Sequence, residues 1–186
     1  MAERNFIKML KARWAEGKFV CVGLDSELAK IPKSAHREGV ANTIVAFNKA
    51  IVEATKHKVC AYKPNVAFYE AHGDEGLVAL RRTIVDIHVF APDVPVILDA
   101  KRADIGNTNA GYVQGAFEFL GADAITVHPY LGAEALQPFL ERADKGIIVL
   151  CRTSNKGARE LQDRHLFLTE EECQDLFCNF NGECTR

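Results

Sequence analysis

Short apolar runs alternate with longer amphipathic segments along most of the chain. Five runs rich in β-branched residues and cysteine are too short for helices and are typical of strands buried on both faces. These runs span residues 18–25, 58–65, 94–101, 123–129 and 145–154. Between them, apolar residues recur at helical spacing in 42–57, 74–90, 107–121 and 132–144. The pattern therefore predicts strands and helices in alternation.

Residues typical of helix ends accompany three of these boundaries. Asn42 and Asp74 stand where side chains that cap helix N-termini are expected. Gly121 stands where a glycine often ends a helix. We therefore expect helices that begin near Asn42 and Asp74, and one that ends near Gly121.

The alternation of strand and helix implies an α/β fold, with parallel strands joined by right-handed crossovers. An open dinucleotide-binding sheet would carry Gly-x-Gly-x-x-Gly after its first strand, and residues 23–33 lack it. Instead, polar residues end one strand after another, and they are Asp25, Lys63, Asp99, Lys101, His128 and Ser154. In a (β/α)8 barrel these ends form the active-site face. We therefore predict the TIM-barrel type of α/β fold.

Only five strand-like runs precede residue 155, whereas a (β/α)8 barrel has eight strands and typically about 250 residues. The expected organisation is an incomplete barrel over 1–163 and a divergent C-terminal tail over 164–186. The tail shows no further alternation of strand and helix, and Thr169 is the expected cap of one short helix there.

The composition is that of an ordinary globular chain, with 186 residues, 48% of them hydrophobic, and a formal net charge of −2. No basic block is present, so the charge pattern favours a small-molecule partner over nucleic acid or a membrane surface. The N-terminal segment 1–19 is mixed in charge and helical in period, without the apolar core of a signal peptide. We expect a cytoplasmic protein.

The six cysteines do not predict a metal site or a disulfide framework. Cys21, Cys60 and Cys151 lie in apolar runs, where a free cysteine acts as a small buried hydrophobic residue. The others, Cys173, Cys178 and Cys184, have spacings unlike the common zinc motifs.

Residues 97–108 read ILDAKRADIGNT and carry the densest group of candidate catalytic side chains. Side chains alternate across a strand, so Asp99 and Lys101 project to the same side and Ala100 to the other. Asp104 follows in the loop, and residues 105–109 open the next helix, whose free N–H groups suit an anion. Flanking carboxylates hold a lysine in its charged form. We therefore predict a protonated lysine between two carboxylates.

A simple solvated turn with weak surface ion pairs is the alternative for this stretch. Lys63 weighs against it, because this residue ends another strand on the same predicted face. The pattern leaves the role of His128 open between pocket lining and structural capping.

LDAKRADIGNT resembles the Asp-x-Lys-x-x-Asp signature of the orotidine 5′-phosphate decarboxylases. FVCVGLDS, AYKPNVAFYEAHG, ITVHPYLG and VLCRTSN are similar to the flanking motifs of the bacterial-type longer subgroup, in colinear order over about residues 5–163. The resemblance implies a carboxy-lyase of de novo pyrimidine biosynthesis that converts orotidine 5′-phosphate to UMP and CO2. It also implies a homodimer without cofactor or metal.

The resemblance further implies a role for each matching residue. Lys101 protonates pyrimidine C6, Asp99 faces the substrate carboxylate, and Lys63 joins the charged network and touches the ribose. The other implied site residues are Asp25 at a ribose hydroxyl, Ser154 at the pyrimidine, Asp104 and Thr108 reaching into the partner subunit's site, and Ile105 at the substrate.

Two other functions stay open at this point. Sugar-phosphate enzymes of the same superfamily resemble this signature but use Mg²⁺ with an acidic residue on the second strand, where this chain has Lys63. The second is an inactive fragment that acts only as an association partner. Barrels usually bind phosphate in the loops after strands seven and eight, and only five strands are predicted here.

Overall fold

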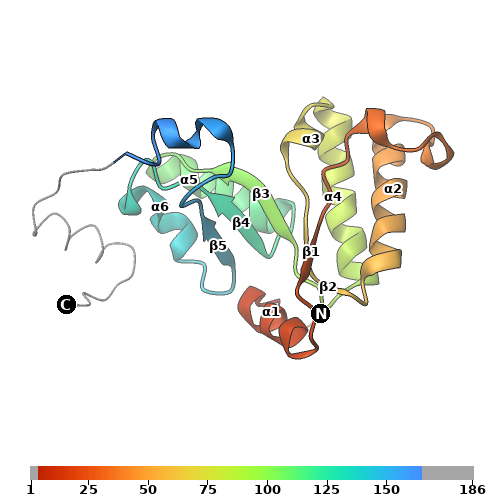
Figure 1. Cartoon of the computed structure of the whole chain (residues 1–186), viewed down its shortest axis with the longest axis horizontal. Helices are drawn as coiled ribbons and strands as arrows, with labels where there is room; N and C mark the ends of the chain where they lie inside the picture. The colour runs from red at the N-terminus through yellow and green to blue at the C-terminus, as the bar shows by residue number, and fades with distance from the viewer. Residues whose placement is uncertain (1–3, 165–186) are drawn as a thin grey trace, which may run out of the picture.

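A computed structural model of the chain describes residues 4–164, which fold as alternating strands and helices (Figure 1). The strands are β1 (Val20–Gly23), β2 (Val59–Lys63), β3 (Ile97–Arg102), β4 (Ala124–Val127) and β5 (Gly146–Val149). The α-helices are α1 (Phe6–Ala15), α2 (Val40–Thr55), α3 (Ala67–Glu70), α4 (Gly73–Phe90), α5 (Gly106–Val113) and α6 (Ala133–Leu140). A π-helical segment, η3 (Gln114–Phe119), continues α5, and short 3-10 turns are η1 (Leu28–Lys30), η2 (Lys33–Ala35) and η4 (Lys156–Glu160). The predicted alternation is confirmed.

The five strands are parallel and follow one another in chain order. β1 pairs with β2, and β4 lies between β3 and β5. Two isolated bridges, Tyr62 to Val96 and Asn65 to Asp99, join β2 to β3. Sequential parallel order is the arrangement of a (β/α) barrel, whereas a doubly wound sheet reverses its order at a switch point. The carboxyl ends of all five strands therefore lie on one face.

A continuous apolar core lies between the strands and their helices. α2 and α4 stand side by side next to β1 and β2, while α5 and α6 flank β3, β4 and β5 (Figure 1). The largest fully buried apolar side chains include Tyr62, Ile44, Leu80, Ile84, Ile125 and Leu136. Burial of this kind stabilises a fold by about 1.5–3 kcal/mol per large side chain, so this core holds the strand ends in place.

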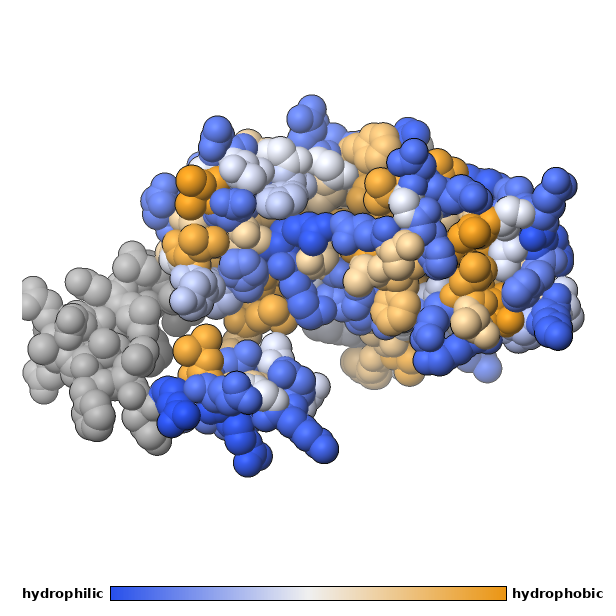
Figure 2. Space-filling view, turned by 90° about the horizontal axis from the view of Figure 1, so that it is seen from above, coloured by the Kyte–Doolittle hydropathy of each residue, from blue (hydrophilic) through white to orange (hydrophobic). Residues whose placement is uncertain are grey.

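The expectation of burial on both faces is right for the central strands and wrong for the outer ones. All four residues of β4 are buried, whereas the side chains of Val20 in β1 and Val149 in β5 are exposed. Within residues 4–164, β1 and β5 each pair with a strand on one side only, so their outer edges are not covered by a neighbouring strand. For the same reason Cys60 is buried as expected, while Cys21 and Cys151 are exposed. Apolar patches also interrupt the charged surface seen in Figure 2.

Helix α1 covers the end of the sheet where the strands begin (Figure 1). The Arg13 guanidinium is 3% exposed and donates to the carbonyl of Val59, the first residue of β2. At β5, the Phe6 ring lies so close to Gly146 that an added Cβ would meet it at 2.3 Å. A glycine is therefore required at position 146 for α1 to close this end of the core.

Two of the predicted helix caps are wrong and one is confirmed. The N-caps of α2 and α4 are Gly39 and His72, so Asn42 and Asp74 lie inside the first turns. The free N–H groups of Val40 and Ala41 donate instead to the Glu75 carboxylate of α4, at 2.9 and 3.1 Å. A capping group 35 residues away in the chain cannot be read from local sequence.

Gly121 adopts a φ of +79° directly after Leu120, the C-cap of the helical segment η3, as the predicted helix end requires. The predicted tail and its short helix at Thr169 lie outside the described residues. Across residues 4–164 no helix combines the length and the apolar character that crossing a membrane requires.

Candidate active site

Three charged side chains meet at the carboxyl ends of β2 and β3. The Lys63 Nζ donates to Asp99 Oδ2 at 3.0 Å, and the Lys101 Nζ donates to Asp99 Oδ1 at 2.7 Å. The Asp99 side chain is 10% exposed, against 32% for Lys63 and 48% for Lys101. The carboxylate is therefore held inside, while both ammonium groups reach the open surface at the face predicted for the active site.

Two further polar groups complete the surroundings of the Asp99 carboxylate. The Thr126 hydroxyl of β4 donates to Oδ1 at 2.9 Å, and the Asn65 amide approaches Oδ2 at 3.4 Å. Burial alone would raise the pKa of the Asp99 carboxyl, but hydrogen bonds from Lys101, Lys63 and Thr126 outweigh it and lower this pKa. Asp99 is thus a stable anion that keeps two lysines in position.

The predicted order of charges is wrong. The sequence predicted an ammonium between two carboxylates, whereas the structure has the carboxylate of Asp99 between the ammonium groups of Lys63 and Lys101. Among the described residues, Asp104 forms no ion pair, and its Oδ1 accepts from the N–H of Ile105 at 2.7 Å. The difference arises because Asp104 lies beyond the end of β3, in the loop before α5.

The loop that carries Asp104 is fastened to the fold by one buried amide. The Asn109 side chain is fully buried, and its Oδ1 accepts from the N–H of Asp104 at 2.7 Å. Its Nδ2 donates to the carbonyls of Asp104 and Ala135, which ties the loop to α6. Ile105 and Thr108 lie exposed on this loop and the first turn of α5. The loop thus presents Ile105 and Thr108 outward, while Asp104 is half-buried.

The remaining predicted site residues lie on the outer strands. Asp25 follows β1 and Ser154 follows β5, and both are exposed. Neither forms a side-chain hydrogen bond or ion pair with the cluster among residues 4–164. His128 follows β4, and its Nδ1 atom is buried without a hydrogen-bond partner in the described part of the chain. The structure therefore brings together Lys63, Asp99 and Lys101 only.

Sequence reasoning missed two residues that contact Asp99. Thr126 lies in the apolar run AITV, where a threonine reads as a β-branched core residue. Asn65 follows Lys63 and Pro64 at the end of β2, so its position at a strand end was the signal that could have revealed it.

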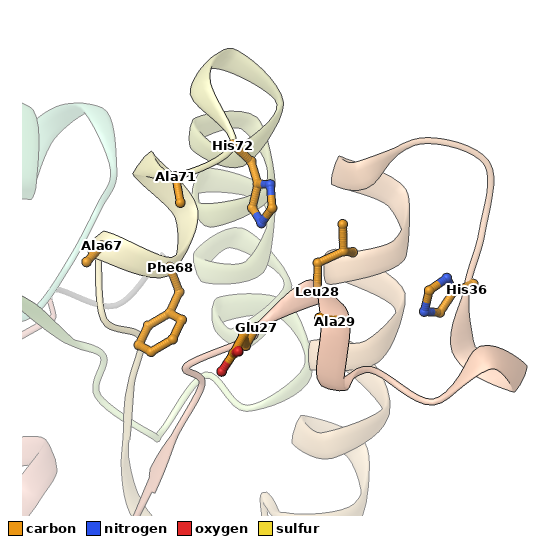
Figure 3. A pocket seen from close by; sticks show the side chains of 8 residues that line it. All are labelled: Glu27, Leu28, Ala29, His36, Ala67, Phe68, Ala71 and His72. Atoms are coloured by element: carbon orange, nitrogen blue, oxygen red, sulfur yellow. The ribbon is translucent and has the colours of Figure 1, made fainter.

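A cavity of about 720 Å³ opens between the segment after β1 and helix α3 (Figure 3). Its walls are mostly apolar and include Leu28, Ala67 and Phe68, with His36 and His72 at its sides. None of the three clustered charged residues lines it. The cavity therefore supplies none of the reacting groups of the candidate site.

No group of three or more His, Cys, Asp or Glu side chains suited to a metal ion occurs within the part of the chain that the structure describes. Both oxygens of Asp99 already accept hydrogen bonds from lysines, and a hard cation such as Mg²⁺ needs several free oxygen ligands. In this structure the Asp99 carboxylate therefore holds two ammonium groups.

Known proteins share this arrangement of strands and motifs. A model of the orotidine 5′-phosphate decarboxylase / HUMPS family matches residues 18–175. The chain belongs to this family. An orotidine 5′-phosphate decarboxylase from Herpetosiphon aurantiacus is 54% identical over 171 residues, which cover 89% of this chain and 62% of that protein. One from Thermomicrobium roseum is 53% identical over 144 residues, which cover 77% of this chain and 50% of that protein.

Solved structures of the family have the same fold. An OMP decarboxylase from Leishmania donovani superposes with a TM-score of 0.76 at 41% identity, covering 87% of this chain and 59% of that chain. A UMP synthase from the same organism superposes with a TM-score of 0.77 at 40% identity, covering 88% of this chain and 34% of that chain. The chain thus has the barrel fold of these decarboxylases over five strands, and it spans 50 to 62% of the two curated relatives.

Proposed function

We propose that this chain carries the catalytic centre of an orotidine 5′-phosphate decarboxylase, a carboxy-lyase that forms UMP and CO2 in de novo pyrimidine biosynthesis. The observation that carries the proposal is the Asp99 carboxylate held at 2.7 and 3.0 Å by two lysines at the carboxyl ends of adjacent strands. Family membership and the curated decarboxylases that are more than 50% identical support it.

The reaction needs a cation where negative charge develops. The bond between C6 and the carboxyl carbon breaks, CO2 leaves, and the electron pair of that bond stays on C6 of the pyrimidine. The Lys101 ammonium then delivers a proton to C6 and is reprotonated by solvent. A fixed ammonium directed at C6 stabilises the transition state, in which the negative charge of the carboxylate moves onto C6, more than the ground state, which is how it accelerates the step.

Asp99 contributes by holding both lysine side chains in fixed positions through hydrogen bonds. Its own pKa is lowered by their hydrogen bonds, so it stays ionised at neutral pH. It also sets a negative charge close to the substrate carboxylate, which disfavours the ground state relative to the transition state, in which this charge has left the carboxylate. Lys63 completes the charged network and contacts the ribose.

The residues outside the cluster bind the substrate in this proposal. Asp25 binds a ribose hydroxyl, and Ser154 contacts the pyrimidine. In a homodimer, Asp104, Ile105 and Thr108 reach the partner's site from the exposed loop before α5 and its first turn. The expected setting is the cytoplasm, with a small-molecule substrate, no nucleic acid and no cofactor.

The test is the loss of ultraviolet absorbance of orotidine 5′-phosphate, with UMP and CO2 measured as products, using purified chain of defined size. We expect turnover that survives EDTA and gains nothing from added Mg²⁺. Turnover that EDTA abolishes would favour the Mg²⁺-dependent relatives. A folded chain without turnover would contradict the proposal and favour the association-only alternative, which co-purification with a full-length decarboxylase subunit tests.

A further inference from the structure

The Thr126 hydroxyl makes three hydrogen bonds at the centre of the candidate site. It donates to Asp99 Oδ1 at 2.9 Å and accepts from the N–H groups of Ala100 and Lys101, each at 3.0 Å. A hydroxyl offers one proton and two lone pairs, so this one is fully used. The Thr126 residue is 7% exposed, which excludes most water from these contacts.

These hydrogen bonds occur at an irregularity in the pairing of β3 with β4. Leu98 pairs with Ile125 and Arg102 with Val127, so three residues of β3 stand opposite the single residue Thr126. A bulge of this kind leaves backbone groups without their regular ladder partners and redirects the side chains that follow. The Thr126 hydroxyl replaces the missing partners for two N–H groups.

The same irregularity gives Lys101 an uncommon backbone conformation. Its φ is +47°, and within residues 4–164 it is the only non-glycine residue with a positive φ. Such a conformation persists only where surrounding contacts hold it. The hydrogen bond from the Lys101 N–H to Thr126 is one of those contacts, and Lys101 still reaches Asp99 at 2.7 Å.

We infer that Thr126 is a positioning residue for the reaction: its hydroxyl holds the β3 bulge so that Asp99 and the Lys101 ammonium keep their catalytic geometry. This inference rests on the proposed decarboxylase function. Thr126 acts through Asp99 and Lys101 and does not itself exchange a proton with the substrate.

The test compares Thr126→Val, which keeps the shape and removes the hydroxyl, with Thr126→Ser, which keeps the hydroxyl. A small displacement of a catalytic group costs up to about 100-fold in rate, so we expect kcat of Thr126→Val to fall by about that factor. KM should change little, and Thr126→Ser should restore most of kcat. Thr43→Val is the matched control, because Thr43 lies in α2, is 3% exposed and hydrogen-bonds to the backbone of Arg37 rather than to the cluster.

A second readout is the titration of Asp99, whose NMR measurement does not depend on activity. The Thr126 hydroxyl is one of the groups that lower the pKa of Asp99, so Thr126→Val should raise that pKa in an NMR titration of the carboxyl carbon. The acid limb of the pH profile of kcat/KM should move upward by the same amount. Thr126→Ser and Thr43→Val should leave both unchanged.

The outcomes separate this inference from the proposed function. An unchanged Asp99 titration in Thr126→Val, or a Thr126→Ser variant as slow as Thr126→Val, overturns the positioning role. A wild-type chain without turnover, together with a shifted titration, overturns the decarboxylase function and the catalytic part of the inference. It would leave Thr126 as a residue that holds the charged cluster only.

Discussion

Two buried aspartates lie at opposite ends of the same parallel sheet, Asp123 just before β4 and Asp99 in β3 at the carboxyl ends. Asp123 is 1% exposed, and its carboxylate accepts two hydrogen bonds from the Arg4 guanidinium, each at 2.7 Å, and one from the Val96 N–H at 2.8 Å. Asp99 is held mainly by lysine side chains that reach the surface.

The two carboxylates differ in whether the charged groups that they hold can still contact a ligand. A bidentate arginine and a backbone N–H fix Asp123 in one geometry and leave no charged group free to react. The lysines on Asp99 are 32% and 48% exposed, so their ammonium groups can meet a ligand. Under the proposed function, the buried charge pair at the start of the strands therefore serves stability, and the one at their carboxyl ends serves chemistry.

The largest expected effect is that of Lys101→Ala on turnover. Removing the proton donor and its charge should lower kcat by about 1000-fold or more. The free energy of unfolding should change by less than about 1 kcal/mol, because this lysine is nearly half exposed. Kinetics and urea unfolding measure the two effects, with the exposed Lys11→Ala as control. Retained activity in Lys101→Ala would remove this lysine from the acid role.

Arg4→Met should show the opposite behaviour at the other end of the sheet. The change leaves the Asp123 carboxylate buried without its guanidinium, which typically costs about 3–5 kcal/mol of unfolding free energy. The kcat of the folded fraction should stay the same. Arg159→Met, at an exposed position, should change stability by about 0.5 kcal/mol or less. Equal stability of the two variants would show that the Arg4 pair contributes nothing.

A matched pair of isoleucines tests the strand that links the two aspartates. Ile125 of β4 is 1% exposed, whereas Ile148 of the outer strand β5 is 37% exposed. Ile125→Ala should lose about 2–5 kcal/mol of unfolding free energy through the cavity that it leaves. Ile148→Ala should lose less than half as much. Equal losses would mean that β5 is covered in solution by something outside residues 4–164.

The smallest effect is the pH dependence of stability through His88, which lies near Asp123. Burial, followed by the positive charge of Arg4, lowers the pKa of His88, while Asp123 opposes this and Lys145 adds to it. The unfolded chain then binds the proton more tightly, so the free energy of unfolding should fall as pH drops below about 6.5. Urea unfolding at pH 7.5 and 5 measures the fall, which His88→Gln should reduce. An identical fall in both proteins would contradict this assignment.

The pKa of Asp99 is lowered, so this carboxyl affects stability in a more acidic pH range than His88 does. Because it is lowered in the fold, its contribution to stability is present above the unfolded value of about 3.9 and is lost only as pH falls below that value. The two ends of the sheet therefore titrate separately.

The parts of the fold that repeat locally were predictable from sequence. Apolar runs located all five strands, and the polar residues that end them located Lys63, Asp99 and Lys101 at one site. The predictions that were wrong concern features that depend on residues distant in the chain. Glu75 caps α2 from another helix, and the exposure of β1 depends on what pairs with its outer edge.

The role of Thr126 shows a further limit. Its hydroxyl matters only because β3 bulges opposite it, and a bulge depends on the pairing of two strands that are distant in sequence. The order of charges failed for a similar reason, since the alternation of a regular strand does not describe the loop that carries Asp104.

The most direct test of the contrast between the two aspartates is to measure kcat/KM and unfolding free energy for Asp99→Asn and Asp123→Asn side by side. We expect Asp99→Asn to lose about 100- to 1000-fold in kcat/KM for orotidine 5′-phosphate, and to lose less stability than Asp123→Asn because the lysine partners of Asp99 are 32% and 48% exposed. We expect Asp123→Asn to lose about 3 kcal/mol of stability and to keep kcat/KM in its folded fraction. Full turnover in Asp99→Asn, or loss of turnover in a stable Asp123→Asn, would contradict the assignment of chemistry to the carboxyl ends of the strands.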